Sequence, residues 1–234
     1  MAQPAHSMSK EKTSPLGKAL IQIAIEFINM PVDKLDAAIN SAMAALGAET
    51  GADRFYVFAY DWQNGTGSNT HEWCAPGIEP QIQTLQNFPL EAFADWIEWH
   101  KDGKVHMIND VATLPADSNL RALPEAQSVL RLIAAPIMYA GVCLGFVGMD
   151  WVRSHKSFSD DDKSLLQLFA EMLANVRNRL AAIKELENVK EELRASEERY
   201  RSLLESDDGA IIVYEPDGKI NFINHVEYGE ISYT

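Results

Sequence analysis

Between Ser159 and Ser206 the sequence contains neither glycine nor proline, the two residues that most often end a helix. Ser159 has the form of a helix cap, and the three aspartates that follow it suit the positive end of a helix dipole. An uninterrupted helix over this range would be on the order of 70 Å long, far more than one small domain can cover. The segment therefore predicts a globular part that ends in a long exit helix.

The long helix carries a heptad pattern in which most a and d positions are apolar. A solitary rod would leave this stripe in water, so we expect two chains to pair in parallel through it as a coiled-coil homodimer. The residues that we expect at this contact are Val176, Ile183, Leu186, Leu193 and Tyr200. Charged residues also occupy a and d positions, where they limit the stability of the pairing and leave it adjustable; they are Arg179, Lys190 and Glu197.

Upstream of this helix, periodicity and turn residues predict alternating helices and strands. Two amphipathic helices come first, separated by Met30-Pro31, and two aromatic, β-branched strands follow. Gly145 and Gly148, inside the last apolar strand, indicate that something packs closely against it. The expected elements are helices at 20–28 and 35–46, strands at 53–61 and 68–75, a helix at 90–104, a short strand at 105–110, a loop with a short helix at 111–127, and a strand hairpin at 127–152.

These elements predict an α+β fold: an antiparallel sheet of about five or six strands, with the N- and C-terminal helices on one face and loops on the other. Residues 1–16 are polar and are expected to form a flexible tail. After Ser206, two short strands flank the turn sequence Glu215-Pro216-Asp217-Gly218. An isolated hairpin is marginal in water, so residues 207–234 are expected to begin a domain that this chain does not complete.

The charge balance limits the possible partners. The 234 residues include 20 Lys and Arg against 34 Asp and Glu, a net charge of −14, whereas a nucleic-acid-binding protein needs the opposite sign. The sequence contains no apolar run of about 18 residues, no N-terminal stretch of the signal-peptide type, and too few cysteines for a disulfide framework. We therefore expect a cytoplasmic protein without nucleic acid or membrane partners.

The order of the elements and three strings resemble GAF domains of bacterial signalling proteins. The strings are SNTHEWCAPGIEP, LRLIAAPIMYAGVCLGFVGMDWVR and FSDDDKSLLQLFAEMLANVRNRL. A fourth string, ASEERYRSLLESDDGAIIVYEPDGKINFIN, resembles the junction at which a PAS domain begins. The resemblance divides the chain into a tail at 1–16, a GAF domain at 17–178, a coiled-coil signalling helix at 179–206 and the start of a PAS domain at 207–234.

This resemblance implies a sensory module. Such a module binds a small molecule or senses a redox signal and relays it through the dimeric helix to an output domain that follows it. The output domain would be a diguanylate cyclase, a cyclic-di-GMP phosphodiesterase or a histidine kinase. The sequence contains no GGDEF or EAL string, no kinase histidine box and no nucleotide-binding glycine loop. We therefore expect neither an enzyme nor a catalytic residue in this chain.

Aromatic side chains on the elements that enclose the cavity of similar GAF domains are the candidate ligand contacts. They are Tyr56, Phe58, Trp73, Trp96, Trp99 and His106. Each of them could equally belong to an ordinary core, and strand alternation does not decide which face lines a cavity. The identity of the ligand and of any cofactor stays open, and a ligand-free dimerisation or assembly module is the competing function.

Known ligands of the family can be compared with these residues. Cyclic-nucleotide binders share an Asn-Lys pair and a later Asp-Glu pair, but this chain has Lys163 after Asp162 and no Asn-Lys pair upstream. Bilin attachment needs a reactive cysteine, commonly next to histidine, whereas Cys74 follows Trp73 and Cys143 lies in an apolar strand. The enzymatic alternative, a GAF-type methionine sulfoxide reductase, needs a set of pocket cysteines that these two do not resemble.

Cys74 is the candidate for a redox sensor, provided that its thiol is exposed and has a lowered pKa. Together with His71 it forms an H-x-x-C pair that could bind a metal. Residues three apart on a strand point to opposite faces, however, and no second pair of suitable spacing is present in the sequence. We therefore expect no metal site.

Overall fold

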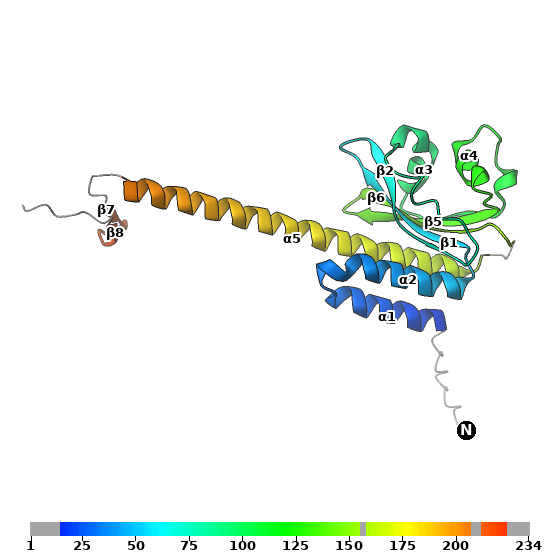
Figure 1. Ribbon diagram of the computed structural model, residues 1–234, viewed down its shortest axis with the longest axis horizontal. Helices are drawn as coiled ribbons and strands as arrows, with labels where there is room; N and C mark the ends of the chain where they lie inside the picture. Colours follow the sequence, from blue (N-terminus) through cyan, green and yellow to red (C-terminus); the bar gives the residue numbers. More distant parts are fainter. Residues whose placement is uncertain (1–14, 155–157, 207–211, 224–234) are drawn as a thin grey trace, which may run out of the picture. The chain divides into compact units, whose positions relative to one another are not determined.

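The computed structural model of the chain describes residues 15–154, 158–206 and 212–223. Six antiparallel strands form a sheet in the order β3-β2-β1-β6-β5-β4, in which the two predicted hairpins lie side by side (Figure 1). This arrangement confirms the expected α+β fold. The strands are β1 (Arg54–Asp61), β2 (Thr66–Cys74), β3 (Phe88–Pro89), β4 (His106–Ile108), β5 (Arg131–Tyr139) and β6 (Val142–Trp151).

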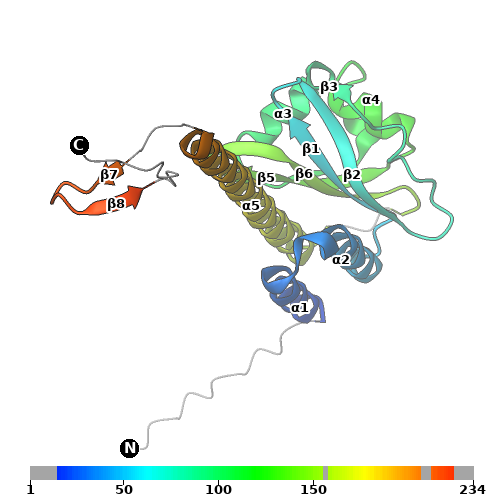
Figure 2. The same cartoon turned by 60° about the vertical axis from the view of Figure 1, so that its left-hand side comes forward.

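Helices cover both faces of the sheet (Figures 1 and 2). On one face lie α2 and the first part of α5, with α1 packed against them, and on the other face lie α3 and α4. The α-helices are α1 (Pro15–Asn29), α2 (Leu35–Thr50), α3 (Ala94–His100), α4 (Asn119–Ala126) and α5 (Asp160–Ser206), and the short 3-10 helices are η1 (Val32–Lys34), η2 (Leu90–Phe93) and η3 (Val111–Thr113).

Several boundaries differ from the sequence-based expectation. The second helix, expected at 35–46, continues through Gly47 to Thr50, and the first two strands are shifted by one or two residues. The first helix begins at Pro15, inside the range expected as a tail, because proline suits the first turn of a helix; residues 1–14 lie outside the described residues. The single helix expected at 90–104 is divided into η2 and α3, and it ends at His100, before Gly103 with its φ of 72°. The two-residue strand β3 is too short to leave a periodic signal.

One core of the fold lies between the sheet and the terminal helices. Phe55 on β1 is fully buried, and its ring lies 5.3 Å from the ring of Phe169 on α5. Phe169 also contacts Phe27 on α1, at a distance of 6.2 Å between ring centroids. Burying a side chain of this size stabilises the fold by about 1.5–3 kcal/mol. These contacts hold the first turns of α5 on the sheet.

Two glycines of β6 allow the close packing that the sequence indicated. A Cβ atom at Gly148 would overlap the ring of Tyr56, and a Cβ atom at Gly145 would overlap the main-chain oxygen of Phe58. Gly145 also has a φ of 144°, which other residues rarely adopt. The ring of Tyr56 therefore packs against β6 at Gly148, and the main chain of β1 approaches β6 closely at Gly145.

The long helix begins as predicted. The hydroxyl of Ser159 accepts a hydrogen bond from the main-chain N–H of Asp162 (3.1 Å), and the Asp162 carboxylate accepts one from the N–H of Ser159 (2.9 Å). This reciprocal pair is a capping box. From there α5 continues without interruption to Ser206. The chain divides into two compact units within α5. The first unit ends at Arg179, and the second begins at Leu180.

The second unit contains the rest of α5 and a separate hairpin. Its strands β7 (Ile212–Tyr214) and β8 (Ile220–Ile223) pair antiparallel, and the N–H of Gly218 donates to the oxygen of Glu215 (2.9 Å), which closes the predicted turn. Residues 207–211 and 224–234 lie outside the described residues, so the start of a PAS domain stays a prediction. No helix in the described part of the chain is both long and apolar enough to cross a lipid bilayer.

Candidate functional site

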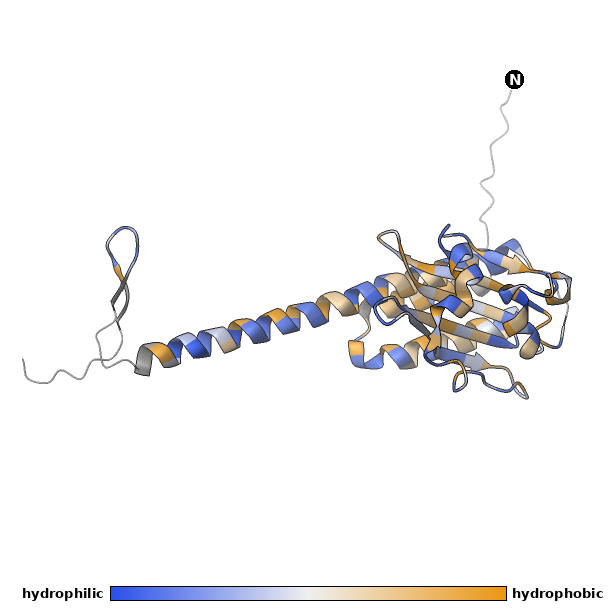
Figure 3. Ribbon diagram, turned by 90° about the horizontal axis from the view of Figure 1, so that it is seen from above, coloured by the Kyte–Doolittle hydropathy of each residue, from blue (hydrophilic) through white to orange (hydrophobic). Residues whose placement is uncertain are grey.

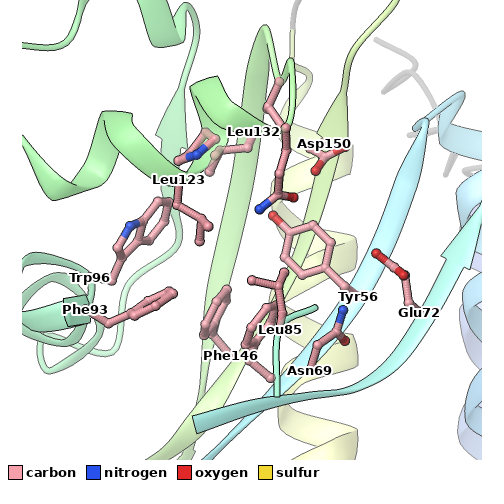
Figure 4. Close-up of a pocket in the computed structure, with 14 residues that line it drawn as sticks. Tyr56, Asn69, Glu72, Leu85, Phe93, Trp96, Leu123, Leu132, Phe146 and Asp150 are labelled. Carbon is pink, nitrogen blue, oxygen red and sulfur yellow. The ribbon is translucent and has the colours of Figure 1, made fainter. Parts of the chain in front are cut away.

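A small cavity lies between the sheet and the helices α3 and α4 (Figure 4). Its volume is about 40 Å³, which leaves room for only a few water molecules. Strands β1, β2, β5 and β6 form its floor, and η2, α3 and α4 supply its other walls. The lining residues are Tyr56, Phe58, Asn69, Glu72, Leu85, Phe93, Trp96, Leu123, Pro124, Gln127, Val129, Leu132, Phe146 and Asp150.

Aromatic rings form a large part of this lining. Phe58 and Phe146 are stacked, with ring centroids 4.7 Å apart and planes that differ by 9°. Trp96 is also nearly parallel to Phe146, with planes that differ by 13° and centroids 6.1 Å apart. Tyr56 meets Phe58 edge-on at 5.7 Å. These rings pack on one another and give the cavity an aromatic wall, against which an apolar or aromatic ligand can pack.

The charged groups at the cavity are already engaged within the protein. The Nε of Arg54 donates to both carboxylate oxygens of Asp150 at 3.1 Å, and each of the two side chains is 3% exposed. Glu72 accepts hydrogen bonds from the N–H groups of Gln81 and Ile82, both at 2.8 Å. Burial raises the pKa of Asp150 and of Glu72, and the guanidinium of Arg54 opposes both shifts.

Tyr56 lies between the aromatic and the charged parts of the lining. Its ring packs over Gly148, and its hydroxyl lies near the charges of Asp150 and Arg54. Burial, followed by the negative charge of Asp150, raises the pKa of this hydroxyl well above its usual value. The hydroxyl therefore keeps its proton at neutral pH and is a hydrogen-bond donor.

Asn69 reaches the cavity because β2 contains a bulge. His71 pairs with Val57, but the next paired residue of β2 is Asn69, opposite Phe58, so Thr70 is the extra residue. In a regular strand Asn69 and His71 would share the face that meets α2. The bulge turns Asn69 to the other face, and Figure 4 shows its amide among the lining residues.

Three buried polar atoms at the cavity have no hydrogen-bond partner among the described residues. They are the amide nitrogen and oxygen of Asn69 and the indole nitrogen of Trp96. An unpaired buried polar group costs about 1–3 kcal/mol and is uncommon in folded proteins. Asn69 and Trp96 lie on different sides of the cavity (Figure 4), and the amide of Asn69 offers a bound molecule both a donor and an acceptor.

His100, on α3, lies behind the aromatic lining. It is fully buried, its ring centroid is 4.6 Å from that of Phe146, and its Nδ1 and the hydroxyl of Tyr60 share a hydrogen bond of 2.8 Å. Its Nε2 has no partner in the described part of the chain. Burial lowers the pKa of His100 to about 3, so the imidazole is neutral at physiological pH.

The sheet and its flanking helices match a known domain family, because the profile of the GAF domain covers residues 34–176. The chain belongs to the GAF domain family. Over 162 residues it is 27% identical to the methanogenesis regulatory histidine kinase FilI of Methanothrix harundinacea (strain 6Ac). The matched region covers 66% of this chain and 18% of that kinase, so the chain spans about a fifth of the length of this relative.

Solved GAF domains share the fold at low sequence identity. The phycocyanobilin-bound GAF domain from a cyanobacterial phytochrome matches with a TM-score of 0.60 and 21% identity, over 72% of this chain and 96% of that chain. The GAF domain from a phosphoenolpyruvate-protein phosphotransferase of Coxiella burnetii matches with a TM-score of 0.58 and 16% identity, over 73% and 96% of the two chains. At these identities the likeness shows a common fold.

The cavity of this GAF domain is lined by three of the six aromatic residues predicted as ligand contacts: Tyr56, Phe58 and Trp96. Trp73 does not take part. Its ring lies across Gly47 of α2, where a Cβ atom would overlap it, so Trp73 belongs to the interface between the sheet and that helix.

Trp99 and His106 also lie outside the lining of the cavity. Their rings stack on each other, with centroids 4.8 Å apart and planes that differ by 20°. The Nε2 of His106 donates to the main-chain oxygen of Trp99 (2.7 Å) and contacts the carboxylate of Asp102 (3.1 Å). This cluster connects α3 to β4. The polar lining comes instead from residues that the sequence did not single out; they are Asn69, Glu72, Gln127 and Asp150.

Neither cysteine lines the cavity. Cys74 is half-buried, and its burial, followed by the negative charge of Glu72, raises the pKa of the thiol to about 12. Cys143 is buried, and burial raises its pKa as well. A reactive cysteine generally has a lowered pKa. The structure therefore disfavours Cys74 as a redox sensor and either cysteine as a site of bilin attachment.

His71 and Cys74 lie on opposite faces of β2, because His71 pairs with Val57 and Cys74 pairs with Arg54. The Nε2 of His71 contacts the carboxylate of Asp36 on α2 at 3.3 Å. Among the residues that the structure describes, no group of three or more His, Cys, Asp and Glu side chains could hold a metal ion.

The residues expected at the dimer contact divide between the two units. Val176 is 5% exposed and is part of the core of the GAF domain, so it is not available to a second chain. The others are exposed, and Figure 3 shows apolar residues recurring along α5 between hydrophilic ones. We call these exposed residues the apolar stripe of α5; they are Ile183, Leu186, Leu193 and Tyr200.

Proposed function

We propose that this chain is a sensory GAF module that binds a small molecule in the cavity and relays the signal through α5 to an output domain. The observation that carries this proposal is the unpaired side-chain amide of Asn69 in an aromatic cavity. A ligand would supply the hydrogen bonds that the protein leaves open. The solved GAF domain that holds phycocyanobilin supports a bound ligand.

The relative FilI, a regulatory histidine kinase, favours a histidine kinase as the output. A diguanylate cyclase and a cyclic-di-GMP phosphodiesterase are the other output domains of this proposal. The chain itself would carry out no catalysis. We place the module in the cytoplasm, in keeping with its two free thiols.

Strand β1 connects the cavity to α5 in the proposed mechanism. Tyr56 lines the cavity, and Phe55, its neighbour on the other face, contacts Phe169 of α5. A cavity of about 40 Å³ is smaller than an aromatic ligand, so binding would displace lining side chains. Because protein interiors are closely packed, a displacement of Tyr56 would also shift Phe55, and through it α5. The ligand would then favour one of two packings of this helix.

The apolar stripe of α5 would complete the relay. We expect its residues to pair with the same residues of a second chain in a parallel coiled coil. Lys190 and Glu197 occupy the same seam and are exposed, and charged residues at such positions permit more than one packing. A change at the start of α5 would therefore be transmitted as a change in the pairing of the two helices.

A second function, a ligand-free assembly module, is favoured by the volume of the cavity. Ligand pockets commonly measure about 300–1,000 Å³, whereas this cavity measures about 40 Å³. In that function the lining is an ordinary core, and the domain contributes only the apolar stripe of α5 to a dimer.

Native mass spectrometry of the purified chain, compared with its denatured mass, tests the two functions. In the Leu132→Phe variant a larger side chain would fill the cavity, and Leu168→Phe is the matched control because Leu168 is 47% exposed on α5. A sensory module is expected to retain a small molecule in the wild type and in Leu168→Phe, and to lose it in Leu132→Phe. A dimer that carries no added mass would favour the assembly module.

A further inference from the structure

The side chain of Asn69 is buried at a position where its unpaired amide lowers the stability of the ligand-free protein. The main chain of this residue is satisfied, because its N–H donates to the oxygen of Leu85 (2.8 Å) and its oxygen accepts from the Nε2 of Gln86 (2.7 Å). The amide itself is 1% exposed and has no partner among the described residues. A leucine of similar volume would avoid this cost. The amide is therefore better explained by a bound molecule than by folding.

The charges around the cavity disfavour an anion. Two carboxylates, Glu72 and Asp150, line it, and no lysine or arginine does. The nearby guanidinium of Arg54 is bound to both oxygens of Asp150 and also donates to the main-chain oxygen of Gln127 (3.2 Å). A phosphate or carboxylate on a ligand would have to leave water and approach these carboxylates without a free cation to neutralise it.

The rings of the cavity favour a flat molecule. Phe58, Phe146 and Trp96 have nearly parallel rings that pack on one another and form an aromatic wall of the cavity. The unpaired atoms of Asn69 are one donor and one acceptor on the same planar group, which is the complement of another amide.

Building on the proposed sensory function, we infer that the cavity selects an uncharged, flat aromatic molecule that carries a carboxamide. Asn69 pairs with the carboxamide of the ligand, the aromatic ring packs against the wall formed by Phe58, Phe146 and Trp96, and anions of the same shape are excluded. This ligand class differs from the cyclic nucleotides, which carry a phosphate.

Benzamide and benzoate provide a matched pair of probes, because they have nearly the same shape and differ in charge at pH 7.5. We would titrate each into the ¹⁵N-labelled chain and follow the main-chain amide signals of the residues that line the cavity, together with the side-chain amide of Asn69 where it is present. A fragment of this size is expected to bind with a Kd on the order of 1 mM. The inference expects benzamide to bind at least about tenfold more tightly than benzoate.

The same titration with Asn69→Leu tests the role of the amide. The leucine is expected to leave the fold at least as stable in urea and to weaken benzamide about tenfold. The matched control is Asn188→Leu, because Asn188 is exposed on α5 and does not line the cavity; benzamide should bind this variant as it binds the wild type.

Three results would overturn the ligand class: benzoate binding as tightly as benzamide, an unchanged benzamide affinity in Asn69→Leu, or no binding of either probe. If Asn69→Leu does not fold, the affinities of benzamide and benzoate for the wild type still test the proposed ligand class. The sensory function is judged separately by native mass spectrometry. A retained anionic molecule there would support the sensory function while overturning the ligand class.

Discussion

Arg179 on α5 donates a hydrogen bond to the main-chain oxygen of Met30, 2.7 Å away and just beyond the end of α1. The same guanidinium donates to the oxygens of Phe27 (3.3 Å) and Ile28 (2.8 Å). The last carbonyls of a helix have no partner within it, and here no glycine cap follows, so Arg179 satisfies them. From the sequence we expected Arg179 to be an adjustable position of the coiled coil. In the structure its guanidinium is instead hydrogen-bonded to the end of α1 in the same chain.

Replacing Arg179 with leucine is therefore expected to destabilise the GAF domain. Loss of three partly exposed, charge-assisted hydrogen bonds should lower the free energy of unfolding by about 1–2 kcal/mol. Lys184→Leu is the control, because Lys184 is exposed on α5 outside the a and d positions and should change the same quantity by less than about 0.5 kcal/mol. Urea denaturation of both variants measures the difference, and equal effects would contradict the capping role of Arg179.

Two glycine-to-alanine variants in β6 are expected to differ in severity. Gly148→Ala meets the ring of Tyr56, which can shift, and should cost about 1–2 kcal/mol. Gly145→Ala meets the main chain of β1 and forces an unfavourable φ, so it should cost more than about 3 kcal/mol. Combining Gly148→Ala with Tyr56→Leu should restore part of the loss. Thermal and urea unfolding check the order, and a reversed order would refute it.

The fold was predictable because its main signals are local. The capping box at Ser159, the turn at Glu215–Gly218 and the alternation of β1 each depend on residues close in sequence. Alternation also placed Tyr56 and Phe58 on one face of β1, but it did not tell which face lines the cavity; the structure shows that this face does.

The polar half of the site depends on information that a single strand does not contain. Asn69 faces the cavity only because Thr70 bulges, and no turn residue marks that bulge in the sequence. Glu72 could be assigned to the cavity only after the register of β2 against β1 was known. Trp73 was assigned to the cavity because it is aromatic, but that register turns it toward α2.

The thiol of Cys74 is expected to react slowly in the folded protein. A pKa of about 12 lies more than three pH units above the usual value of about 8.5, which lowers the thiolate fraction at pH 8 by about a thousandfold. Alkylation by iodoacetamide, followed at the Cys74 peptide by mass spectrometry, should be at least about a hundredfold slower than in urea. Rapid labelling of the folded chain would instead support a redox sensor.

His100 is expected to make the stability depend on pH in the acidic range. Its pKa is about 3 in the folded protein and about 6.5 when unfolded, so between these values only the unfolded chain binds the proton. Its contribution to the free energy of unfolding is complete above about pH 6.5 and is lost as the pH falls toward 3, by about 1.4 kcal/mol per pH unit.

Urea denaturation at several pH values between 7 and 4 measures this dependence. His100→Gln, which has no titrating group, should show a flatter slope than the wild type. Tyr60→Phe is the control: it removes the hydrogen bond to His100 but leaves the burial that is the main cause of the lowered pKa, so the slope should remain. An identical slope in His100→Gln would show that other groups cause the loss in acid.

The apolar stripe of α5 is expected to hold two chains together. Leu186 and Leu193 are 69% and 59% exposed and fall one heptad apart, so the double variant Leu186→Glu and Leu193→Glu would place four carboxylates in the seam of a parallel dimer. The dimer Kd should rise at least about a hundredfold. Ala181→Glu with Ala195→Glu adds the same charges at exposed positions outside the seam and should leave the dimer intact. Analytical ultracentrifugation distinguishes these outcomes. A wild-type chain that is monomeric at high concentration, or equal weakening by both pairs, would show that the stripe does not pair in this way.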